Sequence, residues 1–172
     1  MTAVSHETTP KSCLAPVVDV RVRLLVLGSL PGERSLAAVR YYAHPQNQFW
    51  RLIGGAIGCD LAVLSYADRL AALLASRIGL WDTVATAERT GSSDAALRDP
   101  VANDLHSLAA DLPDLAAIAF NGTAAWRIGT RALGADALPG VARIALPSSS
   151  PLHTIGLAAK LPAWQALSTF IG

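Results

Sequence analysis

Short apolar runs alternate with amphipathic segments along most of the chain. Runs rich in aliphatic and β-branched residues, which are typical of buried strands, occupy 23–31, 79–84, 114–122 and 141–151. Segments whose apolar residues recur at helical spacing occupy 48–58, 66–80, 101–113, 123–134 and 156–172. The resulting order, β-α-α-β-α-β-α-β-α, predicts a three-layer α/β/α sandwich with a mostly parallel central sheet.

Glycine, proline and polar clusters mark the expected boundaries of these elements. We expect Gly134 to close the helix 123–134, and Pro162 to break the last helical segment into two pieces. The polar stretch 88–100 is typical of a loop. Since no internal repeat and no linker is found, we expect residues 1–20 to form a flexible lead-in and residues 21–172 to form one domain.

The composition fits one folded domain, because 172 residues of which 52% are hydrophobic can build a substantial core. The first twenty residues lack the features of a secretory signal, and no apolar run has the length of a membrane-spanning helix. Cys13 and Cys59 are too few for a disulfide framework, a four-cysteine metal site or an iron–sulfur cluster. We therefore expect a cytoplasmic protein without metal or other cofactor.

Three loops that follow predicted strands are rich in Gly, Ser, Asn and Pro, namely 28–35 (GSLPGERS), 120–123 (FNGT) and 146–153 (LPSSSPLH). Ligands of open α/β folds bind beyond the carboxyl ends of the strands, so a site is expected where these loops meet. Taken alone, the first two loops are well explained as tight turns, since 28–35 lacks the glycine spacing of dinucleotide- and phosphate-binding loops. The third loop suits contacts to phosphate oxygens, but also an exposed loop with a helix cap.

The segment 41–50 (YYAHPQNQFW) combines two tyrosines, a proline-braced polar turn, and Asn47 ahead of Phe49 and Trp50. Together with GSLPG, FNG and LPSSSPLH, it resembles the uracil-DNA glycosylase superfamily over roughly residues 24–160. The mismatch-specific uracil/thymine and the hypoxanthine (deoxyinosine) DNA glycosylases are the most similar branches. The resemblance implies a uracil-DNA glycosylase-like fold and a monofunctional enzyme of base excision repair, which flips a deaminated base out of DNA and hydrolyses its N-glycosidic bond.

The resemblance also implies roles for individual residues. Asn47 is then the catalytic residue, and Phe49 and Trp50 belong to the core. The residues implied to contact the base are Tyr42, Asn121, Leu30 and Gly28. Those implied to contact DNA are Ser35, Ser148, Ser149, Ser150, Leu152 and His153, with Leu152 as the wedge that fills the gap in the base stack. From the residues alone, Asn47 could instead cap the following helix, Leu152 could be a packing or exposed loop leucine, and His153 could be solvated.

Leu30 departs from the mismatch-specific branch, which has at this position an Asn thought to place the attacking water. A leucine can neither orient nor deprotonate water. Either the protein is inactive or another residue acts, and the resemblance to the hypoxanthine branch implies Asn47. An Asn amide does not accept a proton near neutral pH, but it can accept a hydrogen bond and orient a water. That suffices when the bond to the base is largely broken before water attacks.

The amide of Asn121 offers one acceptor and two donors. Uracil presents N3–H beside a carbonyl oxygen, and hypoxanthine presents N1–H beside O6, so Asn121 cannot distinguish the two. Adenine shows the reversed pattern at that edge and should be rejected, and guanine differs there only by its added 2-amino group. The sequence therefore predicts deaminated bases as substrates without choosing among them.

We expect the partner to be DNA containing a deaminated base, bound by a monomer without a membrane partner. The net charge of +1 means that any DNA-binding surface must be a local patch. Candidates are Arg34, Arg40 and Arg51 near the first motifs and Arg127 with Arg131 on one helix face, although such residues are often simply solvated. Two other functions stay open: a non-catalytic binder of DNA lesions, which Leu30 favours, and a nucleosidase, which would need the pocket but not the wedge.

Overall fold

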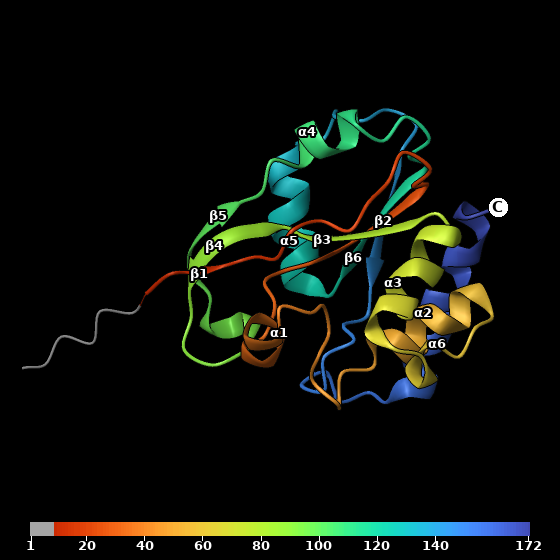
Figure 1. Cartoon of the computed structure of the whole chain (residues 1–172). Coiled ribbons are helices and arrows are strands. Elements are labelled where there is room, and N and C mark those ends of the chain that lie inside the picture. The colour runs from red at the N-terminus through yellow and green to blue at the C-terminus, as the bar shows by residue number, and fades with distance from the viewer. Residues whose placement is uncertain (1–8) are drawn as a thin grey trace, which may run out of the picture.

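The structure, a computed structural model, describes residues 9–172 (Figure 1). Its centre is a four-stranded sheet in which every neighbouring pair is parallel, with the order β3-β2-β6-β7. The strands are β2 (Leu24–Gly28), β3 (Ile78–Asp82), β6 (Ala117–Asn121) and β7 (Ala142–Leu146). They fall within or next to the four apolar runs of the sequence, and the prediction of a mostly parallel sheet is confirmed.

Helices cover both faces of this sheet, as Figure 1 shows. Leu24 and Val26 point to one face and Leu25 and Leu27 to the other, so β2 is buried on both sides. The helices that pack on the Leu24 face are α2 (Phe49–Ile57), α3 (Tyr66–Ala75) and α6 (Leu157–Gln165). Those on the Leu25 face are α4 (Leu105–Ala110) and α5 (Thr123–Leu133). The predicted three-layer α/β/α sandwich is confirmed.

A second, antiparallel sheet was not predicted. It has the order β1-β4-β5 and consists of β1 (Lys11–Ser12), β4 (Val84–Glu88) and β5 (Arg98–Ala102). Strand β5 is exposed along its whole length and contains Pro100, so it carries no apolar alternation that the sequence could reveal. The expected loop 88–100 is therefore partly strand. The expected helix 101–113 begins only at Leu105, where the Asp104 side chain accepts a hydrogen bond from Ser107 N at 3.0 Å.

Three further boundaries differ from the prediction. A short helix, α1 (Glu33–Ala38), begins inside the first loop, 28–35, and was not predicted. The helix expected over 66–80 ends at Ala75, and Ile78 belongs to β3, where it pairs with Leu24. Pro162 does not break the last helix, which continues to Gln165 and then into the 3₁₀ helix η3 (Ala166–Phe170). A proline removes one hydrogen bond of a helix, and here the fully buried Trp164 anchors the turn that follows it.

Helix α5 ends as expected at Gly134, which has a φ of +81° and donates its N–H to Thr130 O at 3.0 Å. Within the predicted lead-in, residues from Lys11 onward lie along the domain. Strand β1 pairs with β4, Val17 bridges to Leu80, and Trp81 Nε1 donates to Leu14 O at 3.2 Å. No helix within residues 9–172 has both the length and the apolar character needed to cross a bilayer.

The order of the parallel strands determines where a ligand can bind. The chain moves from β2 to β3 on one side of the sheet, and later returns to β6 on the other side of β2. Connections that leave in opposite directions open a crevice beyond the carboxyl ends of the strands between them. Gly28 and Asn121 end the two strands at this point.

Candidate active site

A cavity of about 620 Å³ lies at the carboxyl ends of β2, β3 and β6. This volume is within the range of pockets that bind small molecules. Its lining includes all eleven residues that the sequence suggested: Gly28, Leu30, Ser35, Tyr42, Asn47, Asn121, Ser148, Ser149, Ser150, Leu152 and His153. Residues separated by more than a hundred positions in the chain thus meet in one place, as expected from the three loops.

Gly28 is where strand β2 opens into the cavity. A Cβ atom at this position would lie 2.7 Å from Asp82 Oδ1 and 3.2 Å from the Tyr42 hydroxyl. Only glycine therefore allows the ends of β2 and β3 and the Tyr42 side chain to approach so closely. Leu30, two residues later, is 5% exposed and packs with Val84 and Ala87 in a small apolar cluster, so most of its side chain faces the protein.

Asn47 sits at the start of α2, where its backbone N–H donates to His44 O at 3.0 Å. Its side-chain Oδ1 accepts a hydrogen bond from Phe49 N at 2.9 Å, so Asn47 caps the first N–H of α2 from the position before the N-cap residue Gln48, whose own side chain makes no capping bond. One lone pair of Oδ1 and the whole side-chain NH₂ group have no hydrogen-bond partner within residues 9–172. Asn47 can therefore cap α2 and still bind a molecule in the cavity.

Tyr42 is held in place by the aromatic residues of α2. Its ring stacks on Phe49, with centroids 3.8 Å apart and planes 15° from parallel, and its carbonyl oxygen accepts from Trp50 Nε1 at 3.2 Å. Phe49 and Trp50 are buried in the core, as expected. Since Phe49 covers one face of the Tyr42 ring, only the opposite face could stack on a base. Tyr42 also has a φ of +51°, a conformation in which bulky residues are strained.

Asn121 is 7% exposed, and most of its hydrogen-bonding capacity is used inside the protein. Its Nδ2 donates to the Tyr42 hydroxyl at 3.2 Å and to Ser149 Oγ at 2.9 Å, while its Oδ1 accepts from Ser149 N at 2.9 Å. Both amide hydrogens are thereby engaged, and one lone pair of Oδ1 stays available. Tyr42, as an acceptor in this contact, keeps its own hydroxyl proton for another partner. Burial raises the pKa of Tyr42, so the hydroxyl is neutral.

The serine loop, residues 147–153, is fixed by hydrogen bonds at its centre. Ser149 is 1% exposed and bound to Asn121, whereas the Leu152 side chain is 68% exposed. Leu152 is thus no part of the core. Lys160, which is fully buried, donates to Ser150 O at 3.3 Å and to Gln48 Oε1 at 2.8 Å, and Gln48 N donates to Ser149 O at 3.0 Å. These contacts tie the loop to the segment that carries Asn47.

Two acidic residues of the cavity were missed by the sequence analysis. Asp82 ends β3 and is 3% exposed, and Asp94 accepts a hydrogen bond from Ser29 Oγ at 2.5 Å. Burial, with a smaller contribution from the Asp94 charge, raises the pKa of Asp82 well above its ordinary value. The available signal was a single aspartate inside the apolar run 79–84, which was predicted to be a strand.

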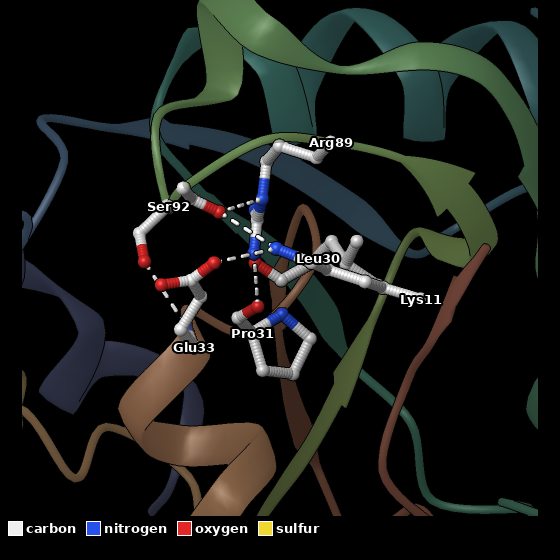
Figure 2. Close-up of polar contacts among 7 residues, drawn as sticks. Lys11, Leu30, Pro31, Glu33, Arg89 and Ser92 are labelled. Atoms are coloured by element: carbon white, nitrogen blue, oxygen red, sulfur yellow. Dashed lines mark hydrogen bonds and ion pairs between the residues drawn. The ribbon is translucent and has the colours of Figure 1, made fainter. Parts of the chain in front are cut away.

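Arg89 is a third residue that the sequence did not reveal, and Figure 2 shows its guanidinium directed at the carbonyl groups of Leu30 and Pro31. Its side chain is 2% exposed, and its guanidinium donates to the carbonyl oxygens of Leu30 at 3.2 Å, of Pro31, and of Gly91 at 3.0 Å. Around it, Lys11 Nζ lies 3.0 Å from Glu33 Oε1, and Ser92 Oγ accepts from Glu33 N at 3.0 Å. Arg89 therefore positions the loop that forms one wall of the cavity.

Arginines 34 and 127 also line the cavity, so two of the five arginines proposed as a basic patch are present there. The guanidinium group of an arginine is well suited to donate hydrogen bonds to the phosphate oxygens of DNA. Within residues 9–172, no three His, Cys, Asp or Glu side chains lie close enough together to hold a metal ion.

The chain is similar to several known proteins. The family model of the uracil DNA glycosylase superfamily matches residues 15–168. A hypoxanthine DNA glycosylase of Methanosarcina barkeri is 42% identical over 112 residues, which cover 65% of this chain and 71% of the relative. A protein of the same name from Methanosarcina acetivorans is 42% identical over 106 residues, covering 62% of this chain and 67% of the relative.

Among solved structures, the solution NMR structure of a candidate uracil DNA glycosylase from Methanosarcina acetivorans matches with a TM-score of 0.81 and 34% identity. The match covers 95% of this chain and 99% of the other. Since the family model spans nearly the whole domain and the fold matches that of the solved relative, the chain belongs to the uracil DNA glycosylase superfamily.

Proposed function

We propose that this protein is a monofunctional DNA glycosylase that removes a deaminated base, hypoxanthine or uracil, from DNA and so begins base excision repair. The observation that carries the proposal is the meeting of Asn47, Tyr42 and Asn121 with the serine loop at one cavity. The relatives named hypoxanthine DNA glycosylase support this substrate class. All the residues involved come from one chain, so the proposal needs no second subunit.

The chemistry requires the cavity to stabilise charge and to hold a water. As the N-glycosidic bond breaks, positive charge develops on the sugar and negative charge on the base. Asn47 is proposed to orient the water, because its free lone pair and NH₂ group offer an acceptor and a donor at the cavity wall. The loop contacts through Gln48 and Lys160 would keep Asn47 in register with the bound DNA strand.

Recognition of the base is proposed to be shared by Asn121 and Tyr42. Because both Nδ2 hydrogens of Asn121 are engaged, its free Oδ1 lone pair is suited only to accept a hydrogen bond. The Tyr42 hydroxyl, which lies 3.2 Å from Asn121 Nδ2, can donate. An acceptor beside a donor matches the N–H and C=O edge of hypoxanthine or uracil, and opposes the reversed edge of adenine. This arrangement differs from the expectation that the Asn121 amide pairs with both groups of that edge, because here Tyr42 would supply the donor.

Duplexes that each contain a single inosine, deoxyuridine or adenosine at one position test the proposal. We expect alkali-labile abasic sites at inosine or deoxyuridine and none at adenosine. If no abasic site forms in any duplex although the protein binds the lesion, the protein is a binder of damaged DNA instead. That outcome would fit Leu30, which stands where the mismatch-specific branch carries its water-positioning Asn.

Replacing Asn121 with alanine should slow base release from hypoxanthine and uracil substrates to a similar extent. The change leaves a polar edge of the base and the buried Ser149 N–H without partners, at a cost of about 1–3 kcal/mol. Single-turnover rates on the two substrates measure the effect. If one substrate is lost and the other untouched, the shared recognition is wrong.

Replacing Leu152 with alanine should slow excision from double-stranded DNA and spare single-stranded DNA. A wedge residue is needed only in double-stranded DNA, where the base stack would otherwise close behind the flipped nucleotide. Since Leu152 is 68% exposed, no cavity forms on truncation and the melting temperature should stay unchanged. Val20→Ala is a matched control, because Val20 is 67% exposed and lies before β2, at the opposite end of the sheet. An equal loss on both DNA forms would exclude the wedge.

A further inference from the structure

Asp82 presents a carboxyl group to the cavity without a partner of its own. It ends β3 next to Gly28, and its Oδ1 lies 2.7 Å from the point where a Cβ of Gly28 would be. Its Oδ2 is buried and has no hydrogen-bond partner within residues 9–172. The backbone carbonyl of Asp82 accepts from Asn103 Nδ2 at 2.8 Å, so the residue is firmly placed. A buried carboxyl group that no protein atom binds, at the wall of a ligand cavity, is available to a ligand.

The surroundings favour the neutral form of this carboxyl group. The titratable and charged side chains that act on it are Tyr41 and Tyr42 from the loop before α2, Asp94 from the 3₁₀ helix η2 (Asp94–Ala96), and Arg89. Arg89 is the cation among them, and its guanidinium is engaged by the carbonyl oxygens of the first loop and of Gly91. Asp94 adds negative charge. An ion buried without a bound counter-charge is strongly disfavoured, so the carboxyl group keeps its proton.

The direction of the pKa shift agrees with this geometry. Burial raises the pKa of Asp82 well above its ordinary value, the Asp94 charge adds to the effect, and the Arg89 charge opposes it in part. Desolvation and like-charge repulsion thus act together, so the Asp82 carboxyl group stays protonated up to a higher pH than an exposed aspartate does.

We infer that Asp82 is a catalytic residue that donates a hydrogen bond from its carboxyl O–H to the departing base. The inference rests on the proposed glycosylase function. In the reaction, the bond from the sugar C1′ to the base nitrogen breaks and its electron pair stays on the base. The water oxygen bonds to C1′, and the proton that this water loses ends on the base. Asp82 keeps its own proton throughout, so the groups balance without any further reactant.

Such a contact accelerates the reaction because it strengthens as the bond breaks. In the bound substrate the base is neutral, and a hydrogen bond to it is of ordinary strength. In the transition state the base carries negative charge, and a donor in a dry cavity then binds it more strongly. A carboxylate in the same place would instead repel the departing base. The activity should therefore depend on the protonation of Asp82.

The test compares Asp82→Ala, which removes the donor, with Asp82→Asn, which keeps an N–H donor of similar size but cannot ionise. Asp114→Asn is the control, because Asp114 is exposed and lies before the amino end of β6. Single-turnover release from inosine- and deoxyuridine-containing oligonucleotides is measured from acidic to alkaline pH. At acidic and neutral pH we expect Asp82→Ala to be about 10²-fold slower, and Asp82→Asn to stay within about tenfold of the wild type.

The pH dependence separates this role from simple packing. The folded pKa of Asp82 is raised, so the wild-type rate is full below that pKa and lost as the pH rises through it. Asp82→Asn should not show this loss. Because the base itself can ionise, a decline that shifts between the inosine and deoxyuridine substrates belongs to the base. The expected result is an alkaline decline that is common to both substrates in the wild type and absent from Asp82→Asn.

Several results would overturn the inference. These are a wild-type rate for Asp82→Ala, an Asp82→Asn rate as low as that of Asp82→Ala at every pH, and an alkaline decline that Asp82→Asn shares with the wild type. If Asp82→Ala fails to fold, the comparison of Asp82→Asn with the wild type decides alone. If the wild type releases no base from either oligonucleotide, the glycosylase function itself fails, and the role of Asp82 fails with it.

Discussion

Replacing Asn47 with alanine is expected to slow single-turnover base release by about two orders of magnitude or more, with little change in the binding of lesion DNA. The reason is that Asn47 is proposed to act on the water only as the sugar becomes positively charged. The structure allows this role, because the amide NH₂ and one lone pair of Oδ1 are free at the cavity wall.

The capping contact of Asn47 gives a competing explanation that the same experiment can separate. Loss of the hydrogen bond from Phe49 N should cost about 1 kcal/mol of stability, which lowers the melting temperature by about 2–4 °C in a domain of this size. Losing this capping contact does not by itself slow base release a hundredfold in a protein that is still folded. Excision at the wild-type rate by a folded Asn47→Ala protein would eliminate Asn47 as the catalytic group.

Replacing Arg89 with methionine is expected to have the largest effect on stability. The carbonyl oxygens of Leu30, Pro31 and Gly91 would lose their donor in a buried place, and each unsatisfied group costs about 1–3 kcal/mol. A loss of about 3 kcal/mol or more lowers the melting temperature by roughly 10 °C. Base release should fall as well, because the first loop forms one wall of the cavity.

Arg143→Met is the matched control for this change. Arg143 also donates to two backbone carbonyls, those of Gly134 at 2.6 Å and Ala137 at 3.0 Å, but it lies on β7 away from the cavity lining. We expect it to lower the melting temperature less and to leave the rate of base release unchanged. If Arg89→Met and Arg143→Met reduce the rate equally, the positioning role of Arg89 is wrong.

The sequence was sufficient to predict the parallel sheet and the place of the cavity. Strand β2 and its parallel neighbours are buried on both faces, so each appears in the sequence as a continuous apolar run. Because the strands are parallel, the loops that follow them must meet at one edge of the sheet. The same reasoning predicts that Gly28, Asn121 and the serine loop lie together at this edge. Helix α2 was predicted because one of its faces is apolar, and Phe49 and Trp50 lie in the core as expected.

The features that escaped prediction depend on contacts between distant residues. Strand β5 has no apolar face, and Arg89 in an otherwise polar stretch resembles any solvated arginine until the first loop folds over it. Asp82 was overlooked because one aspartate in a strand carries no pattern, although its burial next to Gly28 makes it unusual. The engagement of the Asn121 amide hydrogens by Tyr42 and Ser149 could not be foreseen either, since those residues are 79 and 28 positions away.

Single-turnover release of hypoxanthine from an inosine-containing oligonucleotide, compared with its release from free inosine, distinguishes a DNA glycosylase from a lesion binder and from a nucleosidase. We expect the oligonucleotide to yield hypoxanthine and an abasic site, and free inosine to react far more slowly because it lacks the contacts of the serine loop and Leu152. Tight binding of the oligonucleotide without release of any base would contradict the proposed enzymatic function. Equal rates on the oligonucleotide and on free inosine would contradict the DNA substrate and indicate a nucleosidase.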